Sequence, residues 1–258
     1  MMEKSLGECG VAILGGTAGV GFEAAAQFAE TGARVVVLGR NDDRGAAAVT
    51  KLLARVPGAS IAFVRVDAAD AEDAVRAATK ARVLLGQIDV LMCTTGPSHP
   101  PELLHEIPID EVMPRIDEIT RPPLHMMTAV LPAMRAAGGG AMVIVASDAA
   151  KTATPGETLV GAAMGCIVMF ARAAALEEKR CGIRINLLTP SLIADTPGAA
   201  LIDSSPFAAK LFQKAAAMAH LGLADASDLA AMALYLASPA ARRITGQAIS
   251  INGGISVA

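Results

Sequence analysis

The chain has 258 residues, a net charge of −3 at pH 7 and 53% hydrophobic residues. This length suits one large domain or two small ones, and the apolar content provides for a substantial core. With no basic run, no tryptophan and a single tyrosine, the composition argues against nucleic-acid binding. Charged residues make up only 18%, which favours either apolar surface hidden between subunits or strands that are buried on both faces.

Short apolar runs alternate with longer helical patterns along the whole chain. The strand-like runs are 10–14, 34–38, 61–66, 90–93, 141–146, 184–188 and 248–251. The helical stretches are 20–30, 44–56, 71–85, 109–137, 159–179 and 227–236. The strand-like runs are continuously apolar, as is typical of parallel strands covered on both faces. This order predicts an α/β fold with a doubly wound, seven-stranded parallel sheet, in one domain spanning residues 1–258.

Two segments depart from this regular alternation. The 109–137 segment contains Pro114, Pro122 and Pro123, and we expect its helix to be broken or kinked near 120–123. The segment around 190–220 follows the sixth strand, where loops of parallel sheets bind ligands. It is predicted to be a substrate lid, with a plain surface excursion as the alternative.

The cysteines and the apolar segments bear on location. Cys9, Cys93, Cys166 and Cys181 form no Cys-x-x-Cys pair and no cluster with metal-site spacing, so we expect no metal and reduced thiols in a cytoplasmic protein. We recognise no signal peptide. The longest uncharged helical stretch, 158–171, is judged too short to cross a bilayer, and no membrane association is expected.

A glycine-rich turn, Gly15-Gly-Thr-Ala-Gly19-Val-Gly21, connects the first strand to the first helix. Glycines allow a tight turn and a close approach of backbone to a pyrophosphate, which the helix N-terminus attracts. The alternative is a tight turn that holds no ligand. The spacing of these glycines resembles the short-chain dehydrogenase/reductase (SDR) family, and similarity to that family extends to the closing segments at 244–247 and 252–254. The resemblance implies a Rossmann-like fold and an NAD(P)-dependent alcohol/ketone oxidoreductase.

The resemblance also implies which residues would hold the cofactor. Arg40 stands at the end of the second strand, where an arginine suits the phosphate of NADP and an acidic residue suits the ribose of NAD. Asp67 matches the family's adenine-contacting aspartate. Thr94 and Gly96 lie in a segment that replaces the family's Asn-Asn-Ala-Gly. NADP is therefore slightly favoured over NAD, although a solvated Arg40, a capping Asp67 and a loss of cofactor binding remain alternatives.

The family's four catalytic side chains are mostly replaced in this chain. Ser147 matches the serine that polarises the carbonyl. Val160 and Met164 occupy the positions of the Tyr-x-x-x-Lys motif, and Ile119 occupies that of the asparagine. Valine and methionine cannot exchange a proton, so the resemblance implies a degenerate member.

Other polar side chains lie near the expected site. His99, Asp148, Lys151 and Glu157 are candidates for a substitute acid, but each is more typical of a surface residue. Tyr235, the only tyrosine, is expected to pack in the core.

Three hypotheses about function follow. The first is a supporting subunit in a homo- or hetero-oligomer with an active SDR partner. The family includes such mixed complexes, among them a CoA-thioester dehydrogenase of anaerobic toluene breakdown. The second is an atypical NAD(P)H oxidoreductase that uses Ser147 and an acid other than tyrosine. The third is an NADP(H)-binding sensor without turnover.

Overall fold

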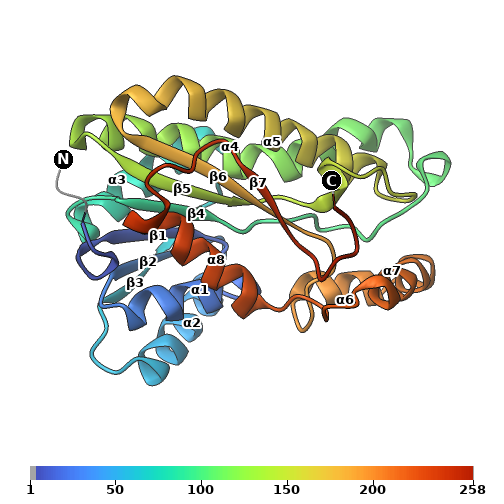
Figure 1. The fold of residues 1–258 in the computed structure, drawn as a ribbon, viewed down its shortest axis with the longest axis horizontal. Helices are drawn as coiled ribbons and strands as arrows, with labels where there is room; N and C mark the ends of the chain where they lie inside the picture. The colour runs from blue at the N-terminus through green and yellow to red at the C-terminus, as the bar shows by residue number, and fades with distance from the viewer. Residues whose placement is uncertain (1–3, 258) are drawn as a thin grey trace.

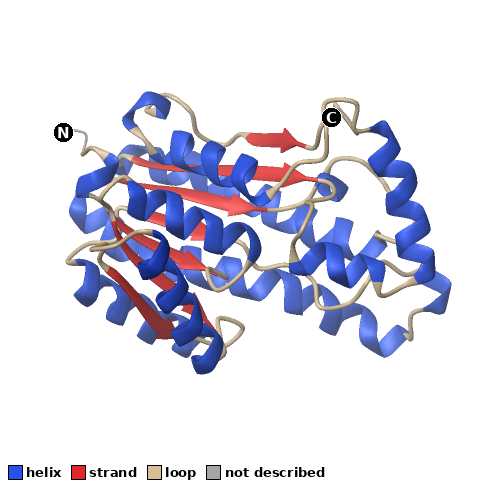
Figure 2. Cartoon of the chain, turned by 90° about the horizontal axis from the view of Figure 1, so that it is seen from below, coloured by secondary structure: helices blue, strands red, loops and turns tan. Residues whose placement is uncertain are grey.

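The computed structural model describes residues 4–257, which form a single seven-stranded sheet with all strands parallel. The strand order is β3-β2-β1-β4-β5-β6-β7, and Figure 2 shows the sheet between two layers of helices. The strands are β1 (Gly10–Leu14), β2 (Arg34–Gly39), β3 (Ile61–Arg65), β4 (Val90–Cys93), β5 (Gly140–Val145), β6 (Ile183–Pro190) and β7 (Ala248–Ile251). The predicted doubly wound parallel sheet is confirmed.

Helices cover both faces of the sheet because the central strands are buried on both sides (Figure 1). One face is covered by α3 (Ala71–Leu85), α4 (Val112–Ala137) and α5 (Thr158–Glu178). The other face is covered by α1 (Gly19–Glu30), α2 (Asp42–Arg55) and α8 (Ala226–Ala237). The segment after β6 forms two further helices, α6 (Pro197–Asp203) and α7 (Pro206–Met218), which extend beyond the carboxyl end of the sheet (Figure 1).

The expected break in the long proline-containing helix does not occur. After a short 3-10 turn at Ile109–Glu111, α4 runs without interruption from Val112 to Ala137, with Pro122 and Pro123 inside it. Each proline removes one backbone donor, but α4 packs against α3 and α5 and buries Pro123. Tertiary packing therefore outweighs the loss of the local hydrogen bonds.

The uncharged stretch 158–171 is part of a longer apolar helix. Residues 158–181, which comprise α5 and a following 3-10 turn, are long and apolar enough by length and composition. This is weak evidence for a membrane span, because a core helix of a compact protein passes the same test. In α5, Ile167 and Ala171 are buried in the core cluster beneath the helix.

Candidate active site

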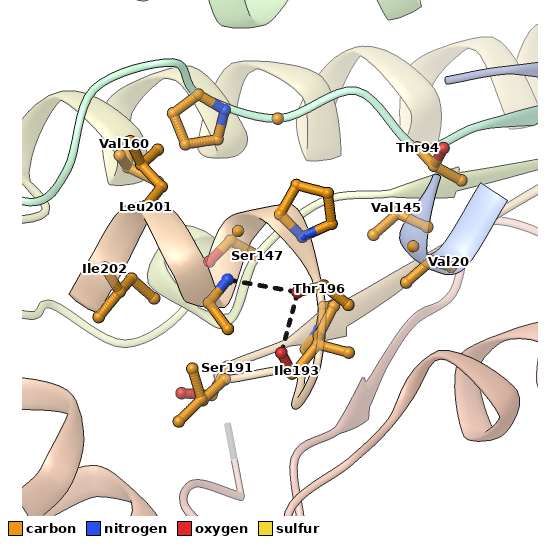
Figure 3. Close-up of a pocket in the computed structure, with 18 of the residues that line it drawn as sticks. Val20, Thr94, Val145, Ser147, Val160, Ser191, Ile193, Thr196, Leu201 and Ile202 are labelled. Carbon is orange, nitrogen blue, oxygen red and sulfur yellow. Dashed lines mark hydrogen bonds between the residues drawn. The ribbon is translucent and has the colours of Figure 1, made fainter. Parts of the chain in front are cut away.

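A cavity of about 330 Å³ opens at the carboxyl ends of the central strands. Its walls come from the glycine-rich turn after β1, the loop after β4, the end of β5, the start of α5 and the segment that leads into α6. Figure 3 shows side chains from the strand ends, α5 and α6 pointing into this space, with Ser147, Val160 and Thr196 among them. This is the position at which parallel α/β sheets bind ligands.

The glycine-rich turn needs its glycines for steric reasons. Gly15 and Gly19 have φ values of +80° and +51°, a region that residues with a Cβ rarely adopt. A Cβ on Gly21 would lie 2.4 Å from the carbonyl oxygen of Gly15. A Cβ on Gly19 would lie 3.2 Å from Cδ of Pro197, so the α6 segment closes directly over the turn.

The loop after β4 contacts and stabilises the glycine-rich turn. The Thr94 hydroxyl donates a hydrogen bond of 3.0 Å to the carbonyl of Leu14, so it binds the protein's own backbone. Thr95 borders two cavities, and its buried Oγ1 has no hydrogen-bond partner within residues 4–257. Gly96 borders the same two cavities. Cys93 is fully buried, and burial raises the pKa of its thiol, so it offers the site neither a charge nor a strong donor.

A second cavity of about 240 Å³ continues beyond Thr95 and Gly96. Arg40 and Asp67 both line it, as does Arg44, which the sequence interpretation did not single out. Arg44 lies in the first turn of α2, four residues after Arg40, and its backbone N–H donates to the Asn41 side chain at 2.8 Å. The Asp67 carboxylate accepts a hydrogen bond of 3.2 Å from the backbone of its own turn.

Ser147 lines the main cavity at the end of β5, as expected. Its Oγ accepts a hydrogen bond of 3.2 Å from the backbone N–H of Ala149, which fixes the hydroxyl at the cavity wall. The next residue, Asp148, is not at the surface: it is 5% exposed and accepts hydrogen bonds from Asn252 at 3.1 Å and from Ser256. The C-terminal segment therefore anchors the loop that carries Ser147.

The three residues that the sequence interpretation matched to the family's proton-transfer groups have apolar surroundings in the structure. Val160 and Met164 line the same cavity as Ser147, on the face of α5 that is directed at it. Ile119 is 4% exposed and belongs to the core cluster between α4 and the sheet. Val160 and Met164 can pack against a ligand in this cavity, but none of the three side chains can exchange a proton with it.

The other candidate polar residues separate into two groups. His99 and Glu157 line the main cavity with Ser147. Lys151 instead donates to Ser250, at the end of β7, and its ammonium lies 4.0 Å from the Asp148 carboxylate. Tyr235 is 45% exposed on α8, so the expectation of core packing is wrong. In the described part of the chain, no three His, Cys, Asp or Glu side chains gather as a metal site.

The two cavities fit a dinucleotide unequally. The glycine turn leaves space that any Cβ would fill. The unpartnered Thr95 hydroxyl lies where the two cavities meet. At the outer end, in the second cavity, Arg40 and Arg44 offer positive charges. At the inner end, in the main cavity, Val160 and Met164 offer a dinucleotide no hydrogen-bond donor. A parallel sheet with a glycine-rich turn at its carboxyl edge defines the class of Rossmann-type dinucleotide-fold proteins.

Comparison with known proteins assigns the family. A family profile described as enoyl-(acyl carrier protein) reductase matches residues 15–256. The chain belongs to the short-chain dehydrogenase/reductase family.

Individual relatives extend over nearly the whole chain. It is 29% identical over 244 residues to a 3-oxoacyl-[acyl-carrier-protein] reductase of Chlamydia muridarum, with 95% of this chain and 96% of the relative covered. It is 30% identical over 251 residues to a 7alpha-hydroxysteroid dehydrogenase of Bacteroides fragilis, with 96% and 94% covered. A crystal structure of the 3-ketoacyl-(acyl-carrier-protein) reductase of Brucella melitensis with NADH is 25% identical, with a TM-score of 0.87 and 98% and 100% covered. These relatives are thus named as reductases and a dehydrogenase, and the Brucella structure contains NADH.

Proposed function

We propose that this chain is a degenerate SDR subunit that supports an active NAD(P)-dependent alcohol/ketone oxidoreductase partner of the same fold. The observation that carries the proposal is the apolar wall formed by Val160 and Met164 in the cavity that Ser147 also lines. Loss of a general acid costs roughly 10²–10⁴-fold in rate. A chain that keeps the fold and the serine but lacks this acid is better suited to assembly than to turnover.

Apolar side chains on the solvent-exposed face of α5 support the proposal that a partner subunit binds. Met169 and Leu176 are 64% and 65% exposed, and Cys166 is exposed as well. Met169 follows Cys166 by three residues and Leu176 follows Met169 by seven, so the three side chains lie along one stripe of the helix. Phe170 borders this stripe. Large exposed apolar side chains in register on one helix are typical of a subunit interface. We infer that a second SDR subunit packs its own helices against α4 and α5 here.

The cofactor proposal concerns the second cavity, which Arg40 and Arg44 line. A bound dinucleotide would place its pyrophosphate at the glycine turn and the N-terminus of α1. The guanidinium groups of Arg40 and Arg44 would hold a ribose phosphate, which favours NADP over NAD. The α6–α7 segment would cover the ligand as a lid.

Co-expression with a Tyr-x-x-x-Lys SDR encoded by a neighbouring gene tests the assembly. The expected result is a stable complex, turnover by the complex, and turnover at least 100-fold lower for this chain alone. Replacing the partner's catalytic tyrosine by phenylalanine should abolish turnover, whereas Ser147→Ala in this chain should leave most of it. Ordinary turnover by the purified chain would refute the proposal.

An exposed-face variant tests the interface. Met169→Glu should prevent the mixed complex from forming, because it places a charge in the apolar contact. Lys51→Glu, an exposed charge reversal on α2 at the opposite face of the sheet, serves as the matched control for charge alone. Assembly of both variants with the partner would rule out this face of α5 as the interface.

A further inference from the structure

The wall of the cavity that lacks the family's tyrosine still contains one carboxyl group. Glu157 lines the cavity and immediately precedes α5, and the N–H of Gly161 donates to its carbonyl. Residues three and seven positions apart share a face of a helix. Glu157 therefore stands on the same wall as Val160 and Met164, one turn before the valine.

The surroundings of Glu157 exclude much of the solvent. The carbonyl of the preceding residue, Gly156, accepts a hydrogen bond of 2.9 Å from the N–H of Glu102. On the other side, the Phe207 ring from α7 lies 2.6 Å from the point that a Cβ on Gly156 would occupy. The loop after β4 and the α6–α7 segment thus enclose this end of α5, and Glu157 is only partly exposed.

The charged groups around this wall have other partners. The elements packed against it carry Asp148 and Lys151 from the loop after β5, His99 and Glu102 from the loop after β4, and Arg115 and Glu118 from α4. Arg115 donates to Glu102 at 2.8 Å, and His99 lies 3.5 Å from Glu118. The Lys151 ammonium donates to Ser250. The residues of α6 and α7 that line the cavity are uncharged.

These surroundings favour the protonated form of the carboxyl. Burial, together with the negative charge of Asp148, raises the pKa of Glu157 to about 7, and a hydrogen bond from Thr154 acts in the opposite direction. A protonated carboxyl can donate a hydrogen bond, whereas a carboxylate only accepts. Glu157 therefore changes from donor to acceptor near neutral pH.

We propose that protonated Glu157, together with the Ser147 hydroxyl, binds the carbonyl oxygen of an uncharged, apolar ligand in this cavity. Leu201, Ile202 and Phe212 provide the apolar contact surface. The carbonyl oxygen needs donors, so the ligand binds only to the protonated form. This inference concerns binding by the chain itself and involves no turnover, so its failure would leave the proposed supporting role intact.

The test measures the affinity of the full chain for α-tetralone and for its alcohol, α-tetralol, by calorimetry between about pH 6 and about pH 9. We expect the Kd of the ketone to rise about tenfold per pH unit above about pH 7. The affinity for the alcohol should not fall, because its hydroxyl can donate to the carboxylate. Failure of the ketone to bind, or an affinity for it that does not change with pH, would overturn the proposal.

Variants assign the titration to one side chain. Glu157→Gln keeps a donor in the amide group, so it should bind the ketone within about threefold of the wild-type value at low pH and lose the pH dependence. Glu157→Ala should weaken binding at least tenfold at about pH 6. Glu177→Gln changes an exposed carboxyl farther along the same helix and should change nothing. A pH dependence that persists in Glu157→Gln, or disappears in His99→Gln, would assign the effect to another group and refute the role of Glu157.

Discussion

The Glu157→Gln substitution is expected to stabilise the protein at neutral and alkaline pH. The pKa of Glu157 rises from its ordinary value of 4.5 to about 7, mainly through burial. At about 1.4 kcal/mol for each unit of pKa change, the shift corresponds to an upper limit of about 3.5 kcal/mol in the free energy of unfolding. Because the side chain is only partly buried, solvent screening reduces the expected effect to about 2 kcal/mol.

The sign of the pH dependence follows from proton binding. Between about pH 4.5 and about pH 7 the folded chain keeps a proton on Glu157 that the unfolded chain releases. This contribution to the free energy of unfolding is therefore fully present below the unfolded-state pKa of about 4.5, and it is lost as the pH rises through the folded-state pKa of about 7. Glutamine does not titrate, so the variant should equal the wild type near pH 4.5 and exceed its stability by about 2 kcal/mol near pH 8.

Urea denaturation followed by far-ultraviolet circular dichroism measures this difference, since the chain has no tryptophan and only one tyrosine as fluorescent probes. Both proteins are compared at one concentration, because any oligomer adds its own contribution. Glu177→Gln, at an exposed position on α5, is the matched control and should follow the wild-type profile. Parallel profiles for wild type and Glu157→Gln from about pH 5 to about pH 8 would show that burial does not perturb this carboxyl.

Three further outcomes follow from the structure. Gly21→Ala should lower the free energy of unfolding by about 2 kcal/mol or more, because its Cβ would lie 2.4 Å from a carbonyl oxygen. Gly165→Ala, in open space on α5, should instead raise the free energy of unfolding by about 0.5–1 kcal/mol. Equal values for the two variants would contradict the steric argument. Asn252→Ala removes a donor from the buried carboxylate of Asp148 and should cost about 1–3 kcal/mol in the same urea assay, so an unchanged midpoint would show that water replaces the lost donor. Arg40→Ala should weaken the binding of NADP about tenfold or more and that of NAD less than about twofold by calorimetry; an equal loss for both would assign Arg40 no role in recognising the ribose phosphate.

Most of the fold could be predicted from the sequence because parallel strands are buried on both faces. A run such as 90–93 must be apolar throughout, and β4 has all four of its residues buried. The proline helix could not be predicted in the same way. Its continuity depends on contacts with α3 and α5, which local hydrogen-bond arguments around Pro122 and Pro123 do not include.

The candidate site was predictable where chain order determines position. Gly15 and Ser147 both follow the carboxyl ends of central strands, so the topology alone brings them to one edge of the sheet. The environment of Glu157 depends instead on Phe207, fifty positions later in the chain, and on the loop after β4. Burial of a carboxyl by segments so distant in sequence leaves no local pattern for a sequence interpretation to detect.

The apolar side chains of Val160 and Met164, at the positions that the sequence interpretation matched to the family's tyrosine and lysine, carry little structural cost, so the proposed degenerate subunit can keep a complete fold. Met164 is 3% exposed and belongs to the core cluster, so an apolar side chain at this position adds to the hydrophobic contact between α5 and the sheet. A lysine there would need a partner for its buried charge. Val160 packs against the same cluster without a hydroxyl that must be satisfied. Restoring the motif through Val160→Tyr and Met164→Lys should therefore destabilise the chain before it restores any chemistry, and a double variant as stable as the wild type would show that the cavity still accommodates the polar pair.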